Sequence, residues 1–299
     1  MKIDLQLHSS YSDGYLTPTE LVKFIAKNGV KVASLTDHNT VRGQEEFKHA
    51  CRKHKIKYIV GLELYVKLGT KKLNMLWFNF NASDPELHQI LRATQLRRRA
   101  KVRKHLELLV EKYKLKIDVN KVLDKYNHYV SINHIIDDIW DVPKNKPIIK
   151  RLLENKYPRE GEIIKGLFYN KLFGSIMHQS YINIDRIIKL RKKIGGQLIL
   201  NHPGKNHDLK LDLLEKLKKI GLDGIEVLTP HHSIGSTMYA QFLAKKLNLI
   251  MTGGSDFHRF EGDGFLIQSS MDYFSIDCRQ LRGIDKIIAI SGKECPTDN

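Results

Sequence analysis

The sequence predicts an α/β protein whose sheet is interrupted by a helical insertion. Three observations support this fold class. Strand-like and helix-like segments alternate over residues 1–83, they alternate again over residues 191–292, and strand signals are nearly absent from residues 84–190. Alternating strands and helices are typical of a parallel sheet covered by helices. We therefore predict one discontinuous α/β domain, 1–83 with 191–292, and a helical insertion domain, 84–190.

The first part of the chain shows clear element boundaries. Apolar and polar side chains alternate over residues 3–7, as in a half-buried strand. Thr17 followed by Pro18 is typical of a helix start, and this helix is expected to end at Asn28 and Gly29. The remaining elements expected here are a strand over 30–35, a helix over 44–55 and a strand over 58–62.

The insertion and the last part of the chain follow different patterns. A long helical pattern runs from Asp84 to about Lys114, and shorter helices are expected at 118–126, 132–139, 145–155 and 160–172. Strands and helices then alternate again. The expected order is helix 183–194, strand 197–201, helix 208–220, strand 223–228, helix 235–247, strand 248–253, and a last strand and helix between residues 265 and 290.

Composition narrows the class of protein. The 299 residues carry a formal net charge of +17, and 41% of them are hydrophobic, which is ordinary globular usage and argues against extensive disorder. No apolar run approaches the roughly 20 residues of a membrane span, and the first residues lack the apolar core of a signal peptide. We therefore expect a cytoplasmic protein without a membrane partner. The positive charge is compatible with an anionic partner, although from the charge alone a solvated Lys-rich surface is the more frequent explanation.

Polar side chains gather where the predicted strands end. The clusters are Gln6 to His8 with Asp13, Thr36 to His38, Gly61 to Glu63, Asn201 to Pro203, Gly224 to Glu226, and Gly253 to His258. In a parallel α/β barrel these ends share one face, and alternate residues on a strand project from the same side. One histidine alone is more often solvated than a ligand. Imidazoles and carboxylates converging from several strands, however, are the ligands of a divalent cation.

These segments resemble, in order, the motifs of the PHP (polymerase and histidinol phosphatase) superfamily. Asp4 to Gly14 resembles its opening motif, and the later motifs are resembled by Thr36 to Thr40, Gly61 to Glu63, Leu200 to Gly204, and Gly253 to His258. The basic segment 97–103 and the stretch 221–233 resemble one branch of the superfamily. That branch contains 5′–3′ exoribonucleases and nucleoside 3′,5′-bisphosphate phosphatases. The resemblance covers about residues 1–260.

The resemblance implies a distorted (β/α)7 TIM-like barrel with three metal positions. By matched position, the first metal would be bound by Gln6, His8, Glu63 and Asp256, the second by Glu63, Asn74 and His202, and the third by Asp13, His38 and His258. The implied cofactors are up to three divalent ions of Mn, Zn, Fe or Mg. The family has His at position 6 and usually at position 74. An amide oxygen binds Zn or Mn more weakly than imidazole, so the first and second positions are expected to be weakened.

The resemblance also implies a function. The chain would be a metal-dependent phosphoesterase that hydrolyses phosphate esters of nucleotides or of short RNA or DNA with a metal-bound hydroxide, and Glu63 would bridge two metals. Arg99 and Arg103 lie one helical turn apart and could bind one substrate phosphate, although a solvated basic face explains either one equally well. His134 and His232 are candidates for a leaving-group acid or a phosphate contact.

Two alternatives remain open at this point. A small-molecule phosphatase of the histidinol-phosphate phosphatase type would share the motifs, although the basic insertion argues against it. A degenerate PHP protein that binds nucleic acid or nucleotide without hydrolysis would explain Gln6, Asn74 and the positive charge. We favour the enzyme, because the other ligand positions keep His, Asp or Glu. The sequence does not indicate the oligomeric state.

Overall fold

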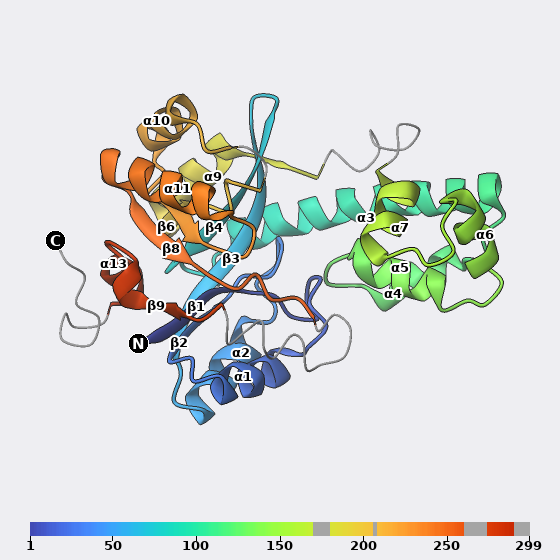
Figure 1. Cartoon of the computed structure of the whole chain (residues 1–299), viewed down its shortest axis with the longest axis horizontal. Helices are drawn as coiled ribbons and strands as arrows, with labels where there is room; N and C mark the ends of the chain where they lie inside the picture. The colour runs from blue at the N-terminus through green and yellow to red at the C-terminus, as the bar shows by residue number, and fades with distance from the viewer. Residues whose placement is uncertain (170–179, 206–207, 260–273, 290–299) are drawn as a thin grey trace. The chain divides into compact units, whose positions relative to one another are not determined.

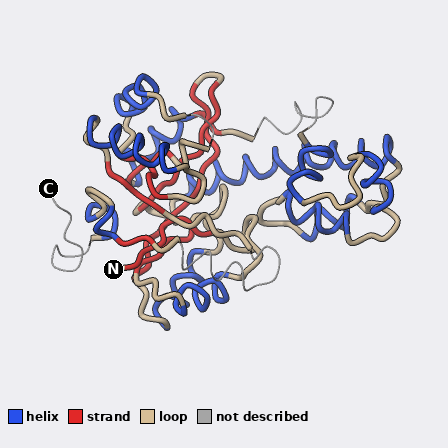
Figure 2. The backbone as a smooth tube through the Cα atoms, viewed as in Figure 1, coloured by secondary structure: helices blue, strands red, loops and turns tan. Residues whose placement is uncertain are grey.

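The computed structural model describes residues 1–169, 180–205, 208–259 and 274–289, and it divides into two compact units (Figure 1). The sheet unit comprises residues 1–87 and 182–299, and the helical unit comprises residues 88–181. As Figure 2 shows, the strands gather in the sheet unit, whereas the helical unit is built from helices and loops. The domain boundaries expected from the sequence, at residues 84 and 190, stay a prediction.

The sheet unit is organised around one sheet. Its strands are β1 (Lys2–Leu7), β2 (Val32–Leu35), β3 (Lys57–Leu68), β4 (Lys71–Phe78), β5 (Ile182–Asn183), β6 (Gln197–Leu200), β7 (Gly224–Leu228), β8 (Ile250–Gly253) and β9 (Ile276–Asp277). The order across the sheet is β8-β7-β6-β4-β3-β2-β1-β9, and β5 pairs with β3. Strands β1 to β3 pair in parallel, as do β6 to β8.

The two ends of the sheet meet just beyond β8. Phe257 forms a parallel bridge with Leu7, the His8 N–H donates to the Phe257 carbonyl at 3.0 Å, and the Asp256 N–H donates to the Gln6 carbonyl at 3.0 Å. The sheet is therefore a nearly closed barrel, which confirms the predicted α/β barrel fold. This closure also brings the segment after β8 beside the end of β1.

The sheet is mixed, so the expectation of a wholly parallel sheet is wrong at β4. Strand β4 pairs antiparallel with both β3 and β6, and β9 pairs antiparallel with β1. The sequence predicts an extended segment here only over residues 58–62. Lys67, Lys71 and Lys72 interrupt the apolar pattern, and Gly69 (φ 59°) occupies the turn of the β3–β4 hairpin, because glycine adopts positive φ without steric cost.

Helices pack against this sheet. They are α1 (Pro18–Lys27), α2 (Gln44–Lys53), α9 (Ile184–Ile194), α10 (Leu211–Ile220), α11 (Ile234–Lys246) and α13 (Asp285–Ile288), with a 3₁₀ turn η1 (Cys278–Gln280). Helix α1 starts where the sequence predicts, since Thr17 and Glu20 form a reciprocal capping box. Its buried Leu21 and Ile25 pack with Phe47 of α2 in one apolar cluster. The predicted strand from residue 265 begins outside the described residues.

The helical unit has a core of its own. It consists of most of α3 (Pro85–Tyr113), together with α4 (Val119–Lys125), α5 (Ile132–Trp140), α6 (Lys146–Leu152) and α7 (Glu160–Phe168). Fully buried Leu106, Leu109 and Ile135 belong to one apolar cluster that spans these helices. The predicted helices are found here, and none of the described residues of this unit forms a strand. Residues 170–172 of the last predicted helix lie outside the described part. Across the described residues, no helix combines the length and hydropathy that crossing a bilayer requires.

Candidate metal centre

The predicted ligands of the sheet unit come together at one end of the barrel. They lie on or just after different strands: Gln6 and His8 at the end of β1, His38 after β2, Glu63 in β3, Asn74 in β4, His202 after β6, and Asp256 and His258 after β8, with Asp13 in the loop between β1 and α1. Strand direction and alternation explain this convergence, because the carboxyl ends of β1, β2, β6 and β8 share one face.

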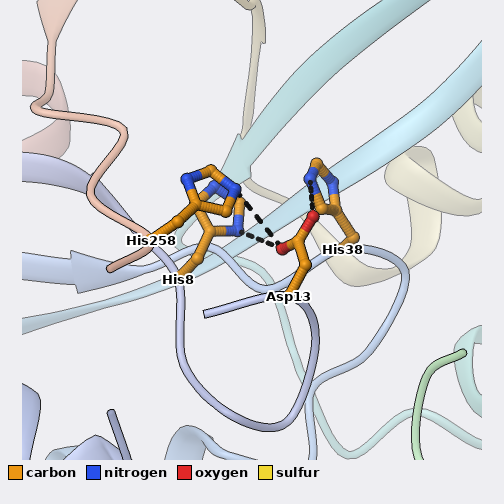
Figure 3. A group of neighbouring side chains, drawn as sticks. All are labelled: His8, Asp13, His38 and His258. Carbon is orange, nitrogen blue, oxygen red and sulfur yellow. Dashed lines mark ion pairs between the residues drawn. The ribbon is translucent and has the colours of Figure 1, made fainter. Parts of the chain in front are cut away.

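Four of these residues form a compact group around the Asp13 carboxylate (Figure 3). The His38 Nε2 atom lies 3.2 Å from Asp13 Oδ2, and the His258 Nε2 atom lies 3.4 Å from Asp13 Oδ1. The His8 Nδ1 atom lies 3.6 Å from the same Oδ1, and the His8 and His258 rings stack with centroids 4.1 Å apart. Three imidazoles thus face one carboxylate, as Figure 3 shows.

The other edge of the His8 ring faces two further carboxylates. Its Nε2 atom lies 3.1 Å from Asp256 Oδ1 and 3.2 Å from Glu63 Oε2. His8 and Glu63 have no solvent exposure, and the Asp256 side chain is 5% exposed. His8 therefore links two groups of potential ligands, each with its ligand atoms within 4.8 Å of one another.

Glu63 is also contacted by both amides that depart from the family pattern. Gln6 Nε2 donates to Glu63 Oε2 at 3.3 Å, and Asn74 Nδ2 donates to Glu63 Oε1 at 3.0 Å. The His202 Nε2 atom lies 3.7 Å from Oε1. All nine predicted metal-ligating positions thus lie in this one cluster, although whether each binds a metal stays a prediction.

Opposite charges stabilise one another within this buried cluster. Burial lowers the pKa of His8, but the carboxylates of Asp256 and Glu63 outweigh it and hold that pKa well above the usual value. Burial raises the pKa of Glu63, but the imidazoles, His38 foremost, hold it well below the usual value. Neighbouring histidines likewise outweigh burial and hold the pKa values of Asp13 and Asp256 well below normal. These carboxylates are anionic near neutral pH, which is the state that binds cations.

The backbone around the cluster is fixed by local hydrogen bonds. Buried Asp37 accepts from the Ser9 N–H at 2.8 Å, from Ser9 Oγ at 2.7 Å and from Ser12 Oγ at 2.6 Å. These bonds order the loop that carries His8 and Asp13. Gly14 is required in this loop, since a Cβ there would lie 2.2 Å from the His8 carbonyl oxygen. Ser9 and Ser12 thus stabilise the conformation of this loop.

Two predicted ligands have unusual backbone conformations. Asp256 has φ 51° and His202 has φ 24°, in the left-handed region that non-glycine residues seldom adopt. Such conformations concentrate at functional sites, where the surrounding structure enforces them. Here the His202 N–H donates to Glu226 Oε2 at 3.1 Å, and the Asp256 N–H donates to Gln6.

The donor set fits divalent cations. Both His8 ring nitrogens are buried without a hydrogen-bond partner, and each faces a carboxylate oxygen. Imidazole combined with carboxylate suits Zn, Mn and Fe, and carboxylate also suits Mg. The residues present are therefore those that a divalent metal centre requires, and a cation held by them would supply Lewis-acid chemistry towards a phosphate ester.

The remaining predicted site residues have well-defined partners of their own. The His232 Nδ1–H donates to the Val227 carbonyl at 3.0 Å, and its Nε2 accepts from the Gly204 N–H at 2.9 Å. Both ring nitrogens of His232 are thus occupied in this conformation. His134, in the helical unit, lies beside Tyr126 with ring centroids 5.5 Å apart.

The two predicted phosphate-binding arginines also make contacts within the helical unit. Arg99 forms an ion pair with Asp124 at 2.6 Å and donates to the Leu123 carbonyl. Arg103 donates to Asn120 Oδ1 at 2.8 Å. These bonds connect α3 to α4, so the arginines have a structural role in addition to any contact with a substrate.

Three polar residues at the cluster, His231, Lys205 and Glu226, are not among the predicted site residues. The His231 Nε2 atom lies 2.5 Å from Asp256 Oδ2, and Lys205 Nζ lies 3.9 Å from the same oxygen. Glu226 is fully buried beside His202, and burial raises its pKa well above the usual value. Glu226 belongs to the strand-end cluster from Gly224 to Glu226, for which the sequence predicts no separate role.

A signal for His231 was present in the sequence without being decisive. Two histidines follow one another after β7, at positions 231 and 232. In a loop the direction of each side chain does not follow a strand's alternation, so the pattern could not identify which ring faces the cluster. The structure places His231 on Asp256 and turns His232 towards Gly204.

Several curated proteins are similar to this chain in sequence. Curated relatives are phosphoribosyl 1,2-cyclic phosphate 1,2-diphosphodiesterase of Eggerthella lenta (24% identity over 85% of this chain and 93% of the relative), 3′,5′-nucleoside bisphosphate phosphatase of Chromobacterium violaceum (25%, covering 86% and 87%), and 5′–3′ exoribonuclease of Haemophilus influenzae (25%, covering 86% and 90%). Similarity therefore extends over most of each protein.

Solved structures show the same fold. A protein of Bifidobacterium adolescentis, described as a metal-dependent phosphoesterase, matches with a TM-score of 0.71 at 22% identity over 87% of this chain and 88% of its own. A Chromobacterium violaceum protein described as an amidohydrolase matches with a TM-score of 0.73 at 23% identity over the same shares. The PHP domain model itself matches residues 4–194. With that match, and with the imidazoles and carboxylates at the strand ends of a nearly closed barrel, the chain belongs to the PHP domain family.

Proposed function

We propose that the chain is a metal-dependent phosphoesterase that hydrolyses phosphate esters of nucleotides or short oligonucleotides. One observation carries the proposal: buried imidazoles and carboxylates from different strands meet around His8 at the end of a PHP barrel. The named activities of the three curated relatives support the reaction class, since all three cleave phosphate esters of nucleotides, RNA or a phosphorylated ribose.

The side chains of the cluster have separate tasks in this proposal. Asp13, His38 and His258 would hold one cation, and His8, Glu63 and Asp256 would hold another. When bound, such cations act as Lewis acids towards a phosphoryl oxygen and lower the pKa of water. The metal is Mn, Zn, Fe or Mg in this proposal, as carboxylate and imidazole ligands allow. Asp37 and the serines that donate to it keep the β1–α1 loop, and with it Asp13, in place.

Cationic side chains would bind the phosphate of the substrate. Arg99, Arg103 and His134 stay candidates for this role in the helical unit. Within the sheet unit, Lys205 is a further candidate, because its side chain is 44% exposed and its Nζ lies 3.9 Å from Asp256 Oδ2. A charged donor at this position could neutralise a phosphate oxygen next to the cations.

The proposal is tested with the purified full chain. We would incubate it with Mn²⁺, Zn²⁺ or Mg²⁺ and one of three substrates: a 5′-phosphorylated oligoribonucleotide, 3′,5′-bisphosphoadenosine or histidinol phosphate. We expect phosphate or mononucleotide to be released from a nucleotide substrate by the wild type and by His49→Ala, which replaces an exposed histidine. His38→Ala should abolish release. Release from histidinol phosphate alone would instead identify a small-molecule phosphatase.

A second candidate function is nucleotide or nucleic-acid binding without hydrolysis. The observation that favours it is the contact of the Gln6 and Asn74 amides with Glu63, where the family carries imidazole. Salt-dependent binding of RNA with no release from any of the three substrates, under every metal, would support this function and reject the enzyme.

A further inference from the structure

Glu63 receives an amide N–H on each of its two oxygens. Gln6 Nε2 lies 3.3 Å from Oε2 and Asn74 Nδ2 lies 3.0 Å from Oε1, and Gln6 and Glu63 are fully buried. An ionised carboxylate can only accept hydrogen bonds. Each amide therefore has to turn its NH₂ group, and not its carbonyl oxygen, towards Glu63. The orientation of both amides follows from the chemistry of their shared partner.

The Asn74 side chain is consequently unsuited to bind a cation together with Glu63. The amide nitrogen that donates to Glu63 offers no lone pair to a metal, and the Asn74 Oδ1 atom, bonded to the same carbon, is not the atom that faces Glu63 Oε1. Turning the amide over would break the 3.0 Å hydrogen bond and bring two oxygens together. Without Asn74, the predicted ligands of this position are Glu63 and His202, whose Nε2 atom lies 3.7 Å from Glu63 Oε1. Two protein ligands are fewer than the three or four that zinc-type sites use.

Gln6 differs from Asn74 in one respect. Its Oε1 atom is buried and has no hydrogen-bond partner, so Gln6 retains an oxygen that a cation beside His8 could use. Gln6 is also closely confined, because a Cβ on Gly254 would lie 2.4 Å from the Gln6 Cβ. The two departures from the family pattern thus have different consequences for metal binding.

A neutral imidazole has a single nitrogen lone pair available for a metal. As a neutral ring, His8 can therefore bind one cation and not two. Its Nε2 lies nearer to carboxylate oxygens, at 3.1 and 3.2 Å, than its Nδ1, at 3.6 Å. This assigns His8 to the group with Glu63 and Asp256. Asp13, His38 and His258 then remain as a complete set of three ligands.

We propose that the chain binds two divalent cations and not the three that the family resemblance implies. One is held by Asp13, His38 and His258, and the other by His8, Glu63 and Asp256. At the remaining position the Asn74 amide holds Glu63 by a hydrogen bond in place of a cation, and His202 is not a ligand. This inference rests on the proposed function in taking the cluster as a metal centre, but it does not require turnover.

The test counts metal ions and needs no substrate. The full chain is saturated with Mn²⁺ or Zn²⁺, desalted and analysed by elemental analysis, with circular dichroism to verify folding. We expect two ions per chain in the wild type and in His202→Ala, and one in His38→Ala. Asn74→His should raise the count to three by supplying an imidazole beside Glu63 and His202. The control Lys216→His adds an imidazole at an exposed site on α10 and should leave the count at two.

Several results would overturn this inference. They are three ions in the wild type, fewer than two ions in the wild type, or loss of an ion in folded His202→Ala. If Asn74→His fails to fold, the wild-type and His202→Ala counts still decide. An active enzyme with three ions would reject the inference and keep the proposed function. Two bound ions without hydrolysis of any substrate would reject the proposed function and keep the inference.

Discussion

His231 Nε2 lies 2.5 Å from Asp256 Oδ2, so the loop after β7 contacts a carboxylate that follows β8. Because the carboxylate accepts, the His231 nitrogen carries the proton of this bond. Asp256 uses its other oxygen, Oδ1, towards His8 at 3.1 Å. His231 therefore orients a predicted metal ligand. Residues that hydrogen-bond to metal ligands in this way fix the ligand's orientation and raise metal affinity.

We expect His231→Ala to weaken metal binding by about 10- to 100-fold, the range observed when such supporting residues are removed. The concentration of Mn²⁺ at half-saturation, measured by calorimetry, checks this. His232→Ala is the matched control, because the adjacent ring contacts Gly204 and Val227 instead. That control should lower stability without a comparable loss of affinity. Equal metal affinity in His231→Ala and the wild type would contradict the prediction.

Arg99 is expected to stabilise the helical unit as well as to bind a substrate phosphate. Its contacts with Asp124 and the Leu123 carbonyl connect α3 to α4. Hydrogen bonds to charged groups contribute about 1.5–3 kcal/mol, and partial exposure reduces this. We therefore expect Arg99→Ala to lower the free energy of unfolding by about 1 kcal/mol and also to raise KM for a phosphorylated substrate.

A second substitution separates the two roles of Arg99. Asp124→Ala removes the ion pair but keeps the guanidinium group. It should lower stability similarly and leave KM unchanged, whereas Arg103→Ala should raise KM with a smaller effect on stability. Denaturant unfolding and steady-state kinetics at low salt measure both quantities. If Arg99→Ala and Arg103→Ala leave KM unchanged, both arginines are structural residues only.

The sequence predicted the elements of this fold better than it predicted their pairing. Thr17, Pro18 and Glu20 specify the start of α1 locally, and the structure shows that capping box. The direction of β4 depends instead on a hairpin turn at Gly69, within a lysine-rich segment that hides the strand pattern. Alternation along the strands could place His8 and Glu63, but the partners of Asn74 depend on register across β3 and β4, which no local pattern contains.

Gly254 is predicted to be indispensable for closing the barrel. A Cβ at this position would lie 2.4 Å from Gln6 Cβ and 2.5 Å from Gln6 N. Gly254→Ala would therefore force β1 and the segment after β8 apart, and overpacking of this kind costs about 1–3 kcal/mol. Gly235→Ala is the control, since its Cβ would have only the Ser233 hydroxyl nearby, at 3.9 Å.

The two glycine variants should shift stability in opposite directions. Gly235 lies in α11, where alanine is favoured by about 0.5–1 kcal/mol over glycine. Thermal unfolding should thus show a lower Tm for Gly254→Ala and a slightly higher Tm for Gly235→Ala. A Gly254→Ala protein as stable as the wild type would show that Gln6 can move away from this contact.

The buried thiol of Cys51 should make the free energy of unfolding fall as the pH rises through the alkaline range. Its thiol is fully buried on α2 against an apolar cluster, and burial raises its pKa to about 12, whereas an unfolded chain has a thiol pKa of about 8.5. Between about pH 8.5 and pH 12 the Cys51 thiol therefore keeps its proton in the folded state and loses it in the unfolded state. The stabilisation is therefore complete below about pH 8.5 and is lost as the pH rises towards 12, by about 1.4 kcal/mol per pH unit.

From pH 8 to pH 10 the free energy of unfolding should fall by about 2 kcal/mol more in the wild type than in Cys51→Ala. Denaturant unfolding at both pH values measures this difference, and groups shared by the two proteins cancel in it. Parallel pH profiles for the wild type and the variant would mean that the Cys51 thiol ionises as readily in the folded chain as in the unfolded one.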